Sequence, residues 1–379
     1  MKNAHPHFSA AEFASRLVRL RSRLRALGVK AALFDEIEAM TWITGYGNSE
    51  NRWRCVVVPV DEEPFFLIRA LDAGQCRKRN WIPDVPQYRD WEDPFPVLAE
   101  RFADRGLSRA RIGLNFNSYG MPLGRFAKLK AALPGVEFVD IGPLVWELRL
   151  IKSEAEIGLL RRAAGIADHT MTRVAAACRP GGAQRDAARV AVASYVELGA
   201  DPGPPGPISA GRGWDFLHAH LDDTPLSNGD VVHVELIPSV GGYSARLMRC
   251  ICIGPIGVDR QRAATKLAEL QERQIAAMRP GVEARAVDAI LREGVIKEGL
   301  RESFDNISGY TLGLYAPAGP RTSDFTRMFH PKADWRLEAG MVFHMYASAA
   351  GVSFSETVLV SADGPQRLTS LPRTLFGTD

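Results

Sequence analysis

The chain has no run of the roughly 18 or more apolar residues that a membrane-spanning helix requires. Its N-terminal stretch, MKNAHPHFSA, lacks the apolar segment of a secretory signal peptide. An excess of one charge is also absent, because 47 lysines and arginines stand against 44 aspartates and glutamates, for a net charge of +3 without a basic stripe. The sequence therefore predicts a cytoplasmic protein that binds neither a membrane nor nucleic acid.

Cysteine is scarce, with five residues in 379. An odd number without regular spacing excludes a disulfide framework. Cys250 and Cys252 are two residues apart, so on a strand both side chains point to the same side, and a metal or redox pair is one interpretation. Small apolar side chains buried in a strand are the commoner alternative, and we favour it.

A chain of 379 residues exceeds the roughly 250 to 300 residues at which a single core stops growing, so two domains are expected. The first 150 residues alternate between helical and strand-like patterns, which predicts an α/β domain. The boundary is expected between Leu150 and Ser153, giving domains of residues 1–150 and 151–379. The first domain has predicted helices at 11–27 and 97–104 and predicted strands at 31–34, 55–60, 65–69, 111–114 and 138–140.

The second domain contains an internal duplication. Ser153 and Glu156 have the spacing of a capping box at the start of a long amphipathic helix. The sequence AACRPG at 176–181 ends that helix and recurs one hundred residues later as AAMRPG. Each copy is followed by a similar strand, GDVVHVEL from Gly229 and GMVFHMYA from Gly340. We therefore expect two similar halves about a pseudo-twofold axis, with helices on one face of a curved sheet.

Residues 229–254 predict an antiparallel hairpin, because apolar and polar side chains alternate with a period of two on both sides of Gly241 and Gly242. A turn centred between residues 240 and 241 makes Glu235 and Arg246 cross-strand neighbours. A carboxylate is then expected to face a guanidinium across the ladder.

The pocket of a duplicated sheet is expected where the two halves meet. Residues that point inward from the paired strands should line it: Glu235, Arg246, Tyr346 and Glu356. His233 and His344 occupy equivalent positions on the duplicated strands, and we expect a structural role in the sheet for both.

Seven motifs, in the same order along the chain, resemble the creatinase, prolidase and aminopeptidase P family. This resemblance covers almost the whole chain. It implies a creatinase-type α/β domain followed by a catalytic domain with the pita-bread fold. The motifs are TWITGYG at 41–47, LRLIKSEAEI at 148–157, GDVVHVE from 229, GYSARLMR from 242, GYTLGL at 309–314, GMVFHMY from 340 and SETVLVSADG at 355–364.

Metallopeptidases of this family hold two divalent ions with two aspartates, one histidine and two glutamates. The resemblance places these ligands on Glu235, Arg246, Tyr310, Tyr346 and Ser355. An arginine repels a dication, and tyrosine and serine hydroxyls are poor ligands unless ionised. The departure predicts no catalytic metal, no cofactor and no general proline-peptidase activity. We expect Arg246 to pair with Glu235 instead, because a buried carboxylate left alone would be costly.

Within the family, creatinase is the nearest functional parallel, a metal-free member that hydrolyses a carbon–nitrogen bond with a histidine as acid and base. The resemblance places that histidine on His218, and His220 in the same segment FLHAHLDD is the alternative. Two arginines that grip the substrate carboxylate fall on Arg52 and Arg321. The family implies a homodimer in which Arg52 of the N-terminal domain serves the partner's active site.

Other positions depart from creatinase. The glutamates that bind creatine's guanidinium group fall on Met248 and Ser355, and its second histidine falls on Tyr310. Creatine is therefore not the expected substrate. What remains implied is a small molecule with a carboxylate and a less cationic far end.

Several residue roles stay open at this point. Glu235 either orients the histidine, binds an ammonium group, acts as a second acid and base, or forms a plain ion pair with Arg246. Tyr310 and Tyr346 either bind substrate or fill the space of the lost metal ions. Glu356 is next to a lost ligand position and reaches the pocket if the strand is displaced by one residue.

Three functions are consistent with these features. The first is a metal-independent hydrolase of a carbon–nitrogen bond in a small carboxylate substrate, with His218 delivering a water. The second is a lyase on the same scaffold, with Glu235 or a tyrosinate as the base. The third is a non-catalytic protein that binds a small ligand.

Overall fold

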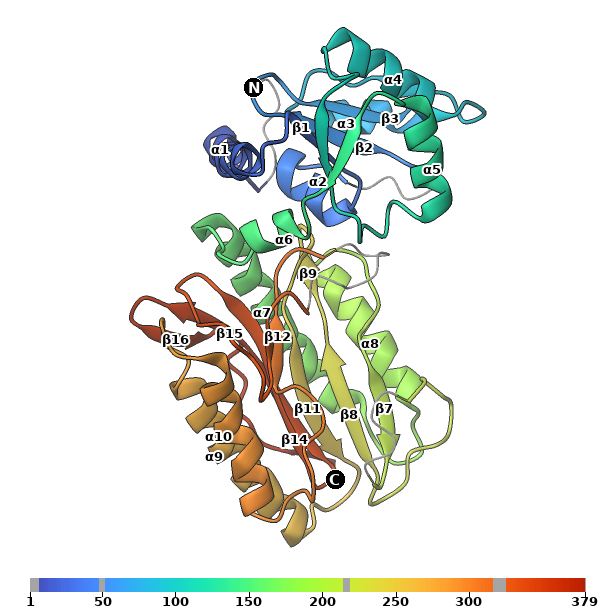
Figure 1. Cartoon of the computed structure of the whole chain (residues 1–379). Helices are drawn as coiled ribbons and strands as arrows, with labels where there is room; N and C mark the ends of the chain where they lie inside the picture. The colour runs from blue at the N-terminus through green and yellow to red at the C-terminus, as the bar shows by residue number, and fades with distance from the viewer. Residues whose placement is uncertain (1–6, 48–51, 214–218, 316–324, 379) are drawn as a thin grey trace. The chain divides into compact units, whose positions relative to one another are not determined.

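The computed structural model describes residues 7–47, 52–213, 219–315 and 325–378 (Figure 1). The described residues up to Arg149 form one compact unit, unit 1, and those from Leu150 onward form a second, unit 2. Among the described residues, no helix is both long enough and apolar enough to cross a membrane.

Unit 1 is built on a six-stranded sheet with the order β4-β3-β2-β1-β5-β6. β1 pairs with β2 antiparallel and with β5 parallel, so the sheet is mixed. Its core packs buried side chains of β1, β2, β3 and β5 against α4 and α5. The strands are Ala31–Phe34, Cys55–Pro59, Phe65–Arg69, Gln87–Tyr88, Arg111–Leu114 and Glu137–Asp140 (β1 to β6).

The helices of unit 1 lie between these strands in the chain. The two helices predicted from sequence are present, each beginning slightly earlier than expected. Ser9 caps the first, because its side chain accepts a hydrogen bond from the amide of Glu12. The helices are α1 (Ala10–Ala26), α2 (Ile37–Thr44), α3 (Ala73–Arg79), α4 (Pro94–Asp104), α5 (Leu123–Ala132) and α6 (Leu144–Leu148), with a 3-10 turn at Ala70–Asp72.

Unit 2 contains two helix pairs that confirm the duplication. α7 (Glu154–Ala177) begins with the predicted capping box of Ser153 and Glu156, and α8 is Gln184–Glu197. α9 (Val258–Ala276) and α10 (Ala284–Lys297) repeat this arrangement. The turns after α7 and α9 are held alike, since Gly181 donates to the carbonyl of Leu226 and Gly281 to that of Leu337, both at 2.8 Å.

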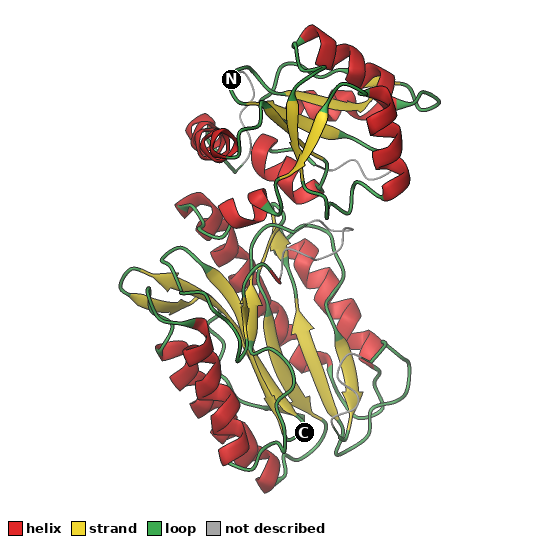
Figure 2. Ribbon diagram, in the orientation of Figure 1, coloured by secondary structure: helices red, strands yellow, loops and turns green. Residues whose placement is uncertain are grey.

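The strands of unit 2 form two larger sheets and one short hairpin. β17-β11-β8-β7 make a four-stranded sheet and β13-β12-β14-β15-β16 a five-stranded sheet. α8 packs on β7, and α9 packs on β14 and β15, so each sheet has its own helix pair (Figures 1 and 2). The strands are Ile208–Gly211, Val231–Leu236, Ser239–Val240, Tyr243–Ser244, Leu247–Cys252, Gly309–Thr311, Met328–Phe329, Val342–Ala349, Val352–Ser361, Gly364–Arg367 and Phe376–Gly377 (β7 to β17).

The two sheets meet at β11 and β15, where side chains replace a backbone ladder. The hydroxyl of Thr357 accepts from the amide of Arg246 and donates to its carbonyl, both at 2.9 Å. The hydroxyl of Ser355 accepts from the amide of Met248 at 2.7 Å. The expected single curved sheet is therefore two sheets joined through serine and threonine side chains.

The predicted register of the hairpin is wrong by two residues. Glu235 lies opposite Met248, not Arg246. The turn consists of Gly241 and Gly242, flanked by the Val240–Tyr243 pair, so its centre lies half-way between the two glycines. Moving the centre by one residue moves every cross-strand partner by two. Arg246 is therefore the diagonal neighbour of Glu235 on the same face, which is still within reach of a long side chain.

Candidate active site

A buried ion pair links the two strands of this hairpin. The Arg246 guanidinium and the Glu235 carboxylate are 7% and 4% exposed, with Nη1 and Oε1 3.4 Å apart. The same Nη1 donates a hydrogen bond to the Tyr310 hydroxyl. The guanidinium carbon lies 5.2 Å from the ring centroid of Tyr310 and 5.9 Å from that of Tyr315, which is cation–π distance. The predicted pairing of Glu235 with Arg246 is thus present despite the changed register.

Three rings from β12 and β14 pack beside this pair. The His344 ring lies 5.0 Å from Tyr310 and 5.3 Å from Tyr346, and the two tyrosine rings are 6.0 Å apart. We call Glu235, Arg246, Tyr310, His344 and Tyr346 the inner-face cluster, because the intervening residues of β14 face the helices. Of those, Phe343 and Met345 belong to a core cluster with Ile275 of α9 and Val287 of α10.

Tyr346 is the partly exposed member of the inner-face cluster. Burial raises the pKa of its hydroxyl to about 12, while a hydrogen bond with the Asn306 side chain opposes the rise. Tyr346 is therefore a neutral phenol near neutral pH, able to donate and accept hydrogen bonds. This protonation state counts against Tyr346 as the tyrosinate base of a lyase.

The two histidines on the duplicated strands have different environments. Nδ1 of His233 lies 2.6 Å from the hydroxyl of Ser353. His344 is fully buried, and neither of its ring nitrogens has a hydrogen-bond partner. Burial, with the nearby charges of Arg246 and His233, holds the pKa of His344 well below its usual range, so its imidazole is neutral. The sequence pattern aligned these two histidines but did not reveal this difference.

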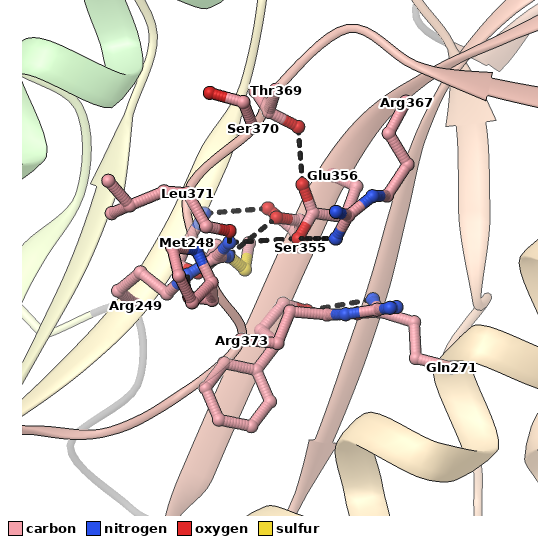
Figure 3. A network of polar contacts seen from close by, with 12 residues as sticks. Met248, Arg249, Gln271, Ser355, Glu356, Arg367, Thr369, Ser370, Leu371 and Arg373 are labelled. Carbon is pink, nitrogen blue, oxygen red and sulfur yellow. Dashed lines mark hydrogen bonds and ion pairs between the residues drawn. The ribbon is translucent and has the colours of Figure 1, made fainter.

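Glu356 does not join the inner-face cluster, contrary to the predicted lining of the pocket. It lies opposite Met345 on β14 and therefore shares the face that packs against the helices. There its carboxylate pairs with Arg249 at 2.8 Å, both side chains being 0% exposed, and accepts from the hydroxyl of Thr369 (Figure 3). Burial is the main cause that raises its pKa, and Arg249 opposes the rise. Glu356 thus holds the segment after β16 against the sheet.

Two of the remaining predicted site residues are exposed, and two lie outside the described residues. His220 is exposed in the segment before β8, and Arg52 is exposed on unit 1 before β2. His218 and Arg321 lie outside the described residues. Their roles stay predictions from the sequence.

All five cysteines are free and buried. The Sγ of Cys250 lies 3.4 Å from the hydroxyl of Ser353, and burial raises the pKa of the thiols of both Cys250 and Cys252. Within the described ranges, no group of three or more histidine, cysteine, aspartate or glutamate side chains is arranged to hold a metal ion.

The fold of unit 2 and the position of the cluster between its halves define a pita-bread protein of the peptidase and creatinase type. Residues 158–362 match metallopeptidase family M24, and residues 16–151 match the creatinase/prolidase N-terminal domain. The chain therefore belongs to metallopeptidase family M24.

Relatives with full-length similarity act on different substrates. The chain is 26% identical to ectoine hydrolase of Halomonas elongata, over 97% of this chain and 98% of the relative. It is 24% identical to creatinase of a Bacillus species, over 97% of this chain and 92% of the relative. It is also similar in structure to a prolidase from Thermococcus sibiricus, with a TM-score of 0.85 and 22% identity over 98% of this chain and 100% of that chain.

Proposed function

We propose that this protein is a metal-independent hydrolase that cleaves a carbon–nitrogen bond in a small substrate bearing a carboxylate. The observation that carries the proposal is the buried pair of Arg246 and Glu235, 3.4 Å apart. It occupies positions to which the family resemblance assigns metal ligands.

The donor set at these positions does not fit a pair of divalent ions. Arg246 brings a fixed positive charge, which repels a cation at short range. Tyr346 is a neutral phenol because its pKa is about 12. The Ser355 hydroxyl already accepts a hydrogen bond from the amide of Met248. One carboxylate, Glu235, is left at the site, whereas hard divalent cations take several oxygen ligands.

The cluster, together with His218 as predicted from the sequence, supplies the groups for a metal-free hydrolysis in this proposal. In the proposed reaction, the oxygen of a water molecule bonds to the substrate carbon, and His218 takes a proton from that water. The guanidinium of Arg246 donates to the oxygen on which negative charge develops. The carbon–nitrogen bond then breaks as His218 returns the proton to the leaving nitrogen. Glu235 orients the imidazole or the water.

The polar groups of the cluster favour a small substrate without a strongly cationic end. Tyr310 and Tyr346 offer hydroxyls, and Arg246 already balances Glu235. The substrate carboxylate is assigned to Arg52 and Arg321, whose planar guanidinium groups donate two parallel hydrogen bonds. Arg52 is exposed, and in this proposal it serves the active site of the partner in a homodimer. Ectoine hydrolase and creatinase, both relatives over nearly the whole chain, support a hydrolase of small molecules.

The test is a substrate screen in water enriched in heavy oxygen. Ectoine, creatine, N-acyl amino acids, ureas, betaines and Xaa-Pro dipeptides are incubated with the purified protein, and products are identified by mass spectrometry. We expect one small carboxylate to be hydrolysed with incorporation of solvent oxygen, no loss of rate with a chelator, and loss of turnover in His218→Ala. Cleavage of Xaa-Pro dipeptides alone, abolished by the chelator, would contradict the proposal.

A lyase is the second candidate, and one contact favours it. The Tyr310 hydroxyl accepts a hydrogen bond from the Arg246 guanidinium, and a positively charged donor favours negative charge on the accepting oxygen. Tyr310, unlike Tyr346, is therefore placed to act as a base. A product free of solvent oxygen in the same screen would identify the lyase, and ligand-induced thermal stabilisation without any turnover would identify a binding protein.

A further inference from the structure

His344 is a buried polar side chain without the hydrogen bonds that such groups normally make. Its ring is 0% exposed, and both nitrogens lack a partner. A neutral imidazole has one donor and one acceptor. Most buried polar atoms in proteins have at least one partner, so an exception requires an explanation.

The duplicated strand provides an internal comparison. His233, the equivalent residue on β8, has Nδ1 2.6 Å from the hydroxyl of Ser353. Cys250 lies opposite His233 and contacts Ser353. In the second hairpin, Thr357 lies opposite His344 and bonds to the backbone of Arg246, so Arg246 corresponds to Ser353. The Arg246 side chain, however, pairs with Glu235. The symmetry that gives His233 a partner thus leaves His344 without one.

Packing alone does not account for a histidine at this position. The ring contacts Tyr310 and Tyr346 through its aromatic faces and edges, which a phenylalanine ring also does. The two nitrogens add only the cost of leaving water. A residue that lowers stability in the free protein is typical of a functional site.

We infer that His344 contacts the substrate, and that one of its ring nitrogens hydrogen-bonds to the polar group next to the bond that is cleaved. The ligand class is a small molecule with an uncharged hydrogen-bonding group at that end, such as an amide or a urea. This inference deepens the proposed function and rests on the same inner-face cluster. Because the imidazole is neutral, it recognises an uncharged group beside the Arg246 cation.

Tyr346 gives such a ligand a route to His344. Its ring lies 5.3 Å from that of His344 and is the partly exposed member of the cluster. Rotation of this side chain exposes the imidazole, and the same phenol is then free to bind the ligand. His344 is thus covered in the free protein and paired in the complex.

The experiment compares His344→Phe with His233→Phe in the full-length protein. Thermal unfolding is measured without ligand and with each compound of the substrate screen. We expect His344→Phe to raise Tm by roughly 2–4 °C, because it removes an unpaired polar group. His233→Phe should lower Tm, because it removes the hydrogen bond with Ser353. His344→Phe should also abolish the ligand-induced rise in Tm and lower kcat/KM by about 100-fold.

Several outcomes would overturn the inference. If Tm falls in His344→Phe as it does in His233→Phe, His344→Leu is measured next, because leucine needs less space. A fall in Tm in both His344 variants means that His344 has a structural role. The inference is also contradicted if a folded His344 variant is stabilised by ligand, or turns over substrate, as strongly as the wild type. It is likewise contradicted if no compound stabilises the wild-type protein. If compounds stabilise the wild type without hydrolysis, the proposed function fails, whereas loss of that stabilisation in His344→Phe still supports His344 as a ligand contact.

Discussion

At the scale of single residues, the charge of Arg246 sets the character of the site. A guanidinium stays protonated at all accessible pH values, so its positive charge always opposes the binding of a metal ion at this position. Its partner Glu235 is 4% exposed and therefore depends on nearby positive charge and hydrogen bonds. The pair is thus a fixed electrostatic feature of the inner-face cluster.

Removal of the cation should expose this dependence. Arg246→Met is expected to lower the free energy of unfolding by about 3–5 kcal/mol, because it leaves a buried carboxylate poorly compensated. Adding Glu235→Gln should recover part of the loss. Chemical denaturation of the single and double variants measures both effects. Arg185→Met breaks an exposed pair with Asp223 and serves as control, with little expected change, because solvent screens the pair. Equal losses in Arg246→Met and the control would refute the account.

A second residue-scale prediction concerns Glu36 in unit 1. Burial and the neighbouring carboxylates of Asp35 and Glu38 raise its pKa to about 8. The folded state therefore holds a proton that the unfolded state, with an ordinary pKa near 4.3, has lost. The stabilisation from this proton is complete at low pH and disappears as the pH rises through about 8.

Glu36→Gln should remove this pH dependence. At pH 9 the variant should be more stable than the wild type by roughly 1–3 kcal/mol, and the difference should shrink toward pH 5. Unfolding midpoints across this pH range provide the measurement, and the exposed Glu100→Gln is the matched control. A variant that is less stable than the wild type at pH 9 would show that the fold stabilises the Glu36 carboxylate, which contradicts a raised pKa.

At the scale of elements, one glycine determines how closely the segment before β7 approaches β8. Gly206 has φ +111°, and an added Cβ would lie 1.9 Å from the carbonyl oxygen of Glu235. The next residue, Pro207, accepts from the amide of Glu235 at 2.9 Å. The backbone at Glu235 is therefore held by a contact that only glycine permits.

Gly206→Ala should displace the Glu235 backbone. We expect a loss of at least about 2 kcal/mol in unfolding free energy, from strain and from overpacking, together with reduced turnover. Gly203→Ala in the same loop is the control, because nothing lies within 4 Å of its added Cβ. Thermal unfolding and activity of the two variants test the contact. If they behave alike, the close approach has no energetic role.

The elements also show which features the sequence predicts and which it does not. β1, β3 and β5 have the predicted bounds, because short apolar runs between turn residues are local signals. The capping box of Ser153 and Glu156 is equally local. The register at Glu235 is not a local signal, because it depends on where the centre of the turn lies relative to Gly241 and Gly242.

The environments of Glu356 and His344 depend on contacts distant in sequence. Glu356 differs from Ser355 by one position, yet this places it on the opposite face, against Arg249 from another sheet. His344 lacks the serine that pairs with His233, because Arg246 occupies the equivalent position and its side chain contacts Glu235 and Tyr310. Neither contact can be read from periodicity. The sequence assigned Glu356 to the pocket, where the structure does not place it, and the structural role that it assigned to His344 stays a prediction.

At the scale of the whole molecule, the proposed role of Arg52 requires a second chain. Arg52→Ala and Glu235→Gln should each be inactive alone. In a dimer with one chain of each variant, one of the two sites has both residues intact. About half of the dimers in an equimolar mixture are of this kind, so co-refolded mixtures should regain about a quarter of wild-type activity. Mixing Glu235→Gln with Arg246→Met is the control without recovery, because both changes lie in unit 2. An absence of recovery in the first mixture would contradict a shared site.

In the proposed function, the Arg246 guanidinium replaces the bound ions of metal-dependent family members. The most direct measurement is the metal content of purified, active protein by inductively coupled plasma mass spectrometry, with activity assayed in the same sample before and after chelation. We expect far less than one manganese, zinc or cobalt ion per chain, and the same activity before and after chelation. One or two ions per chain, with activity that is lost on chelation and restored by the metal, would contradict the proposal.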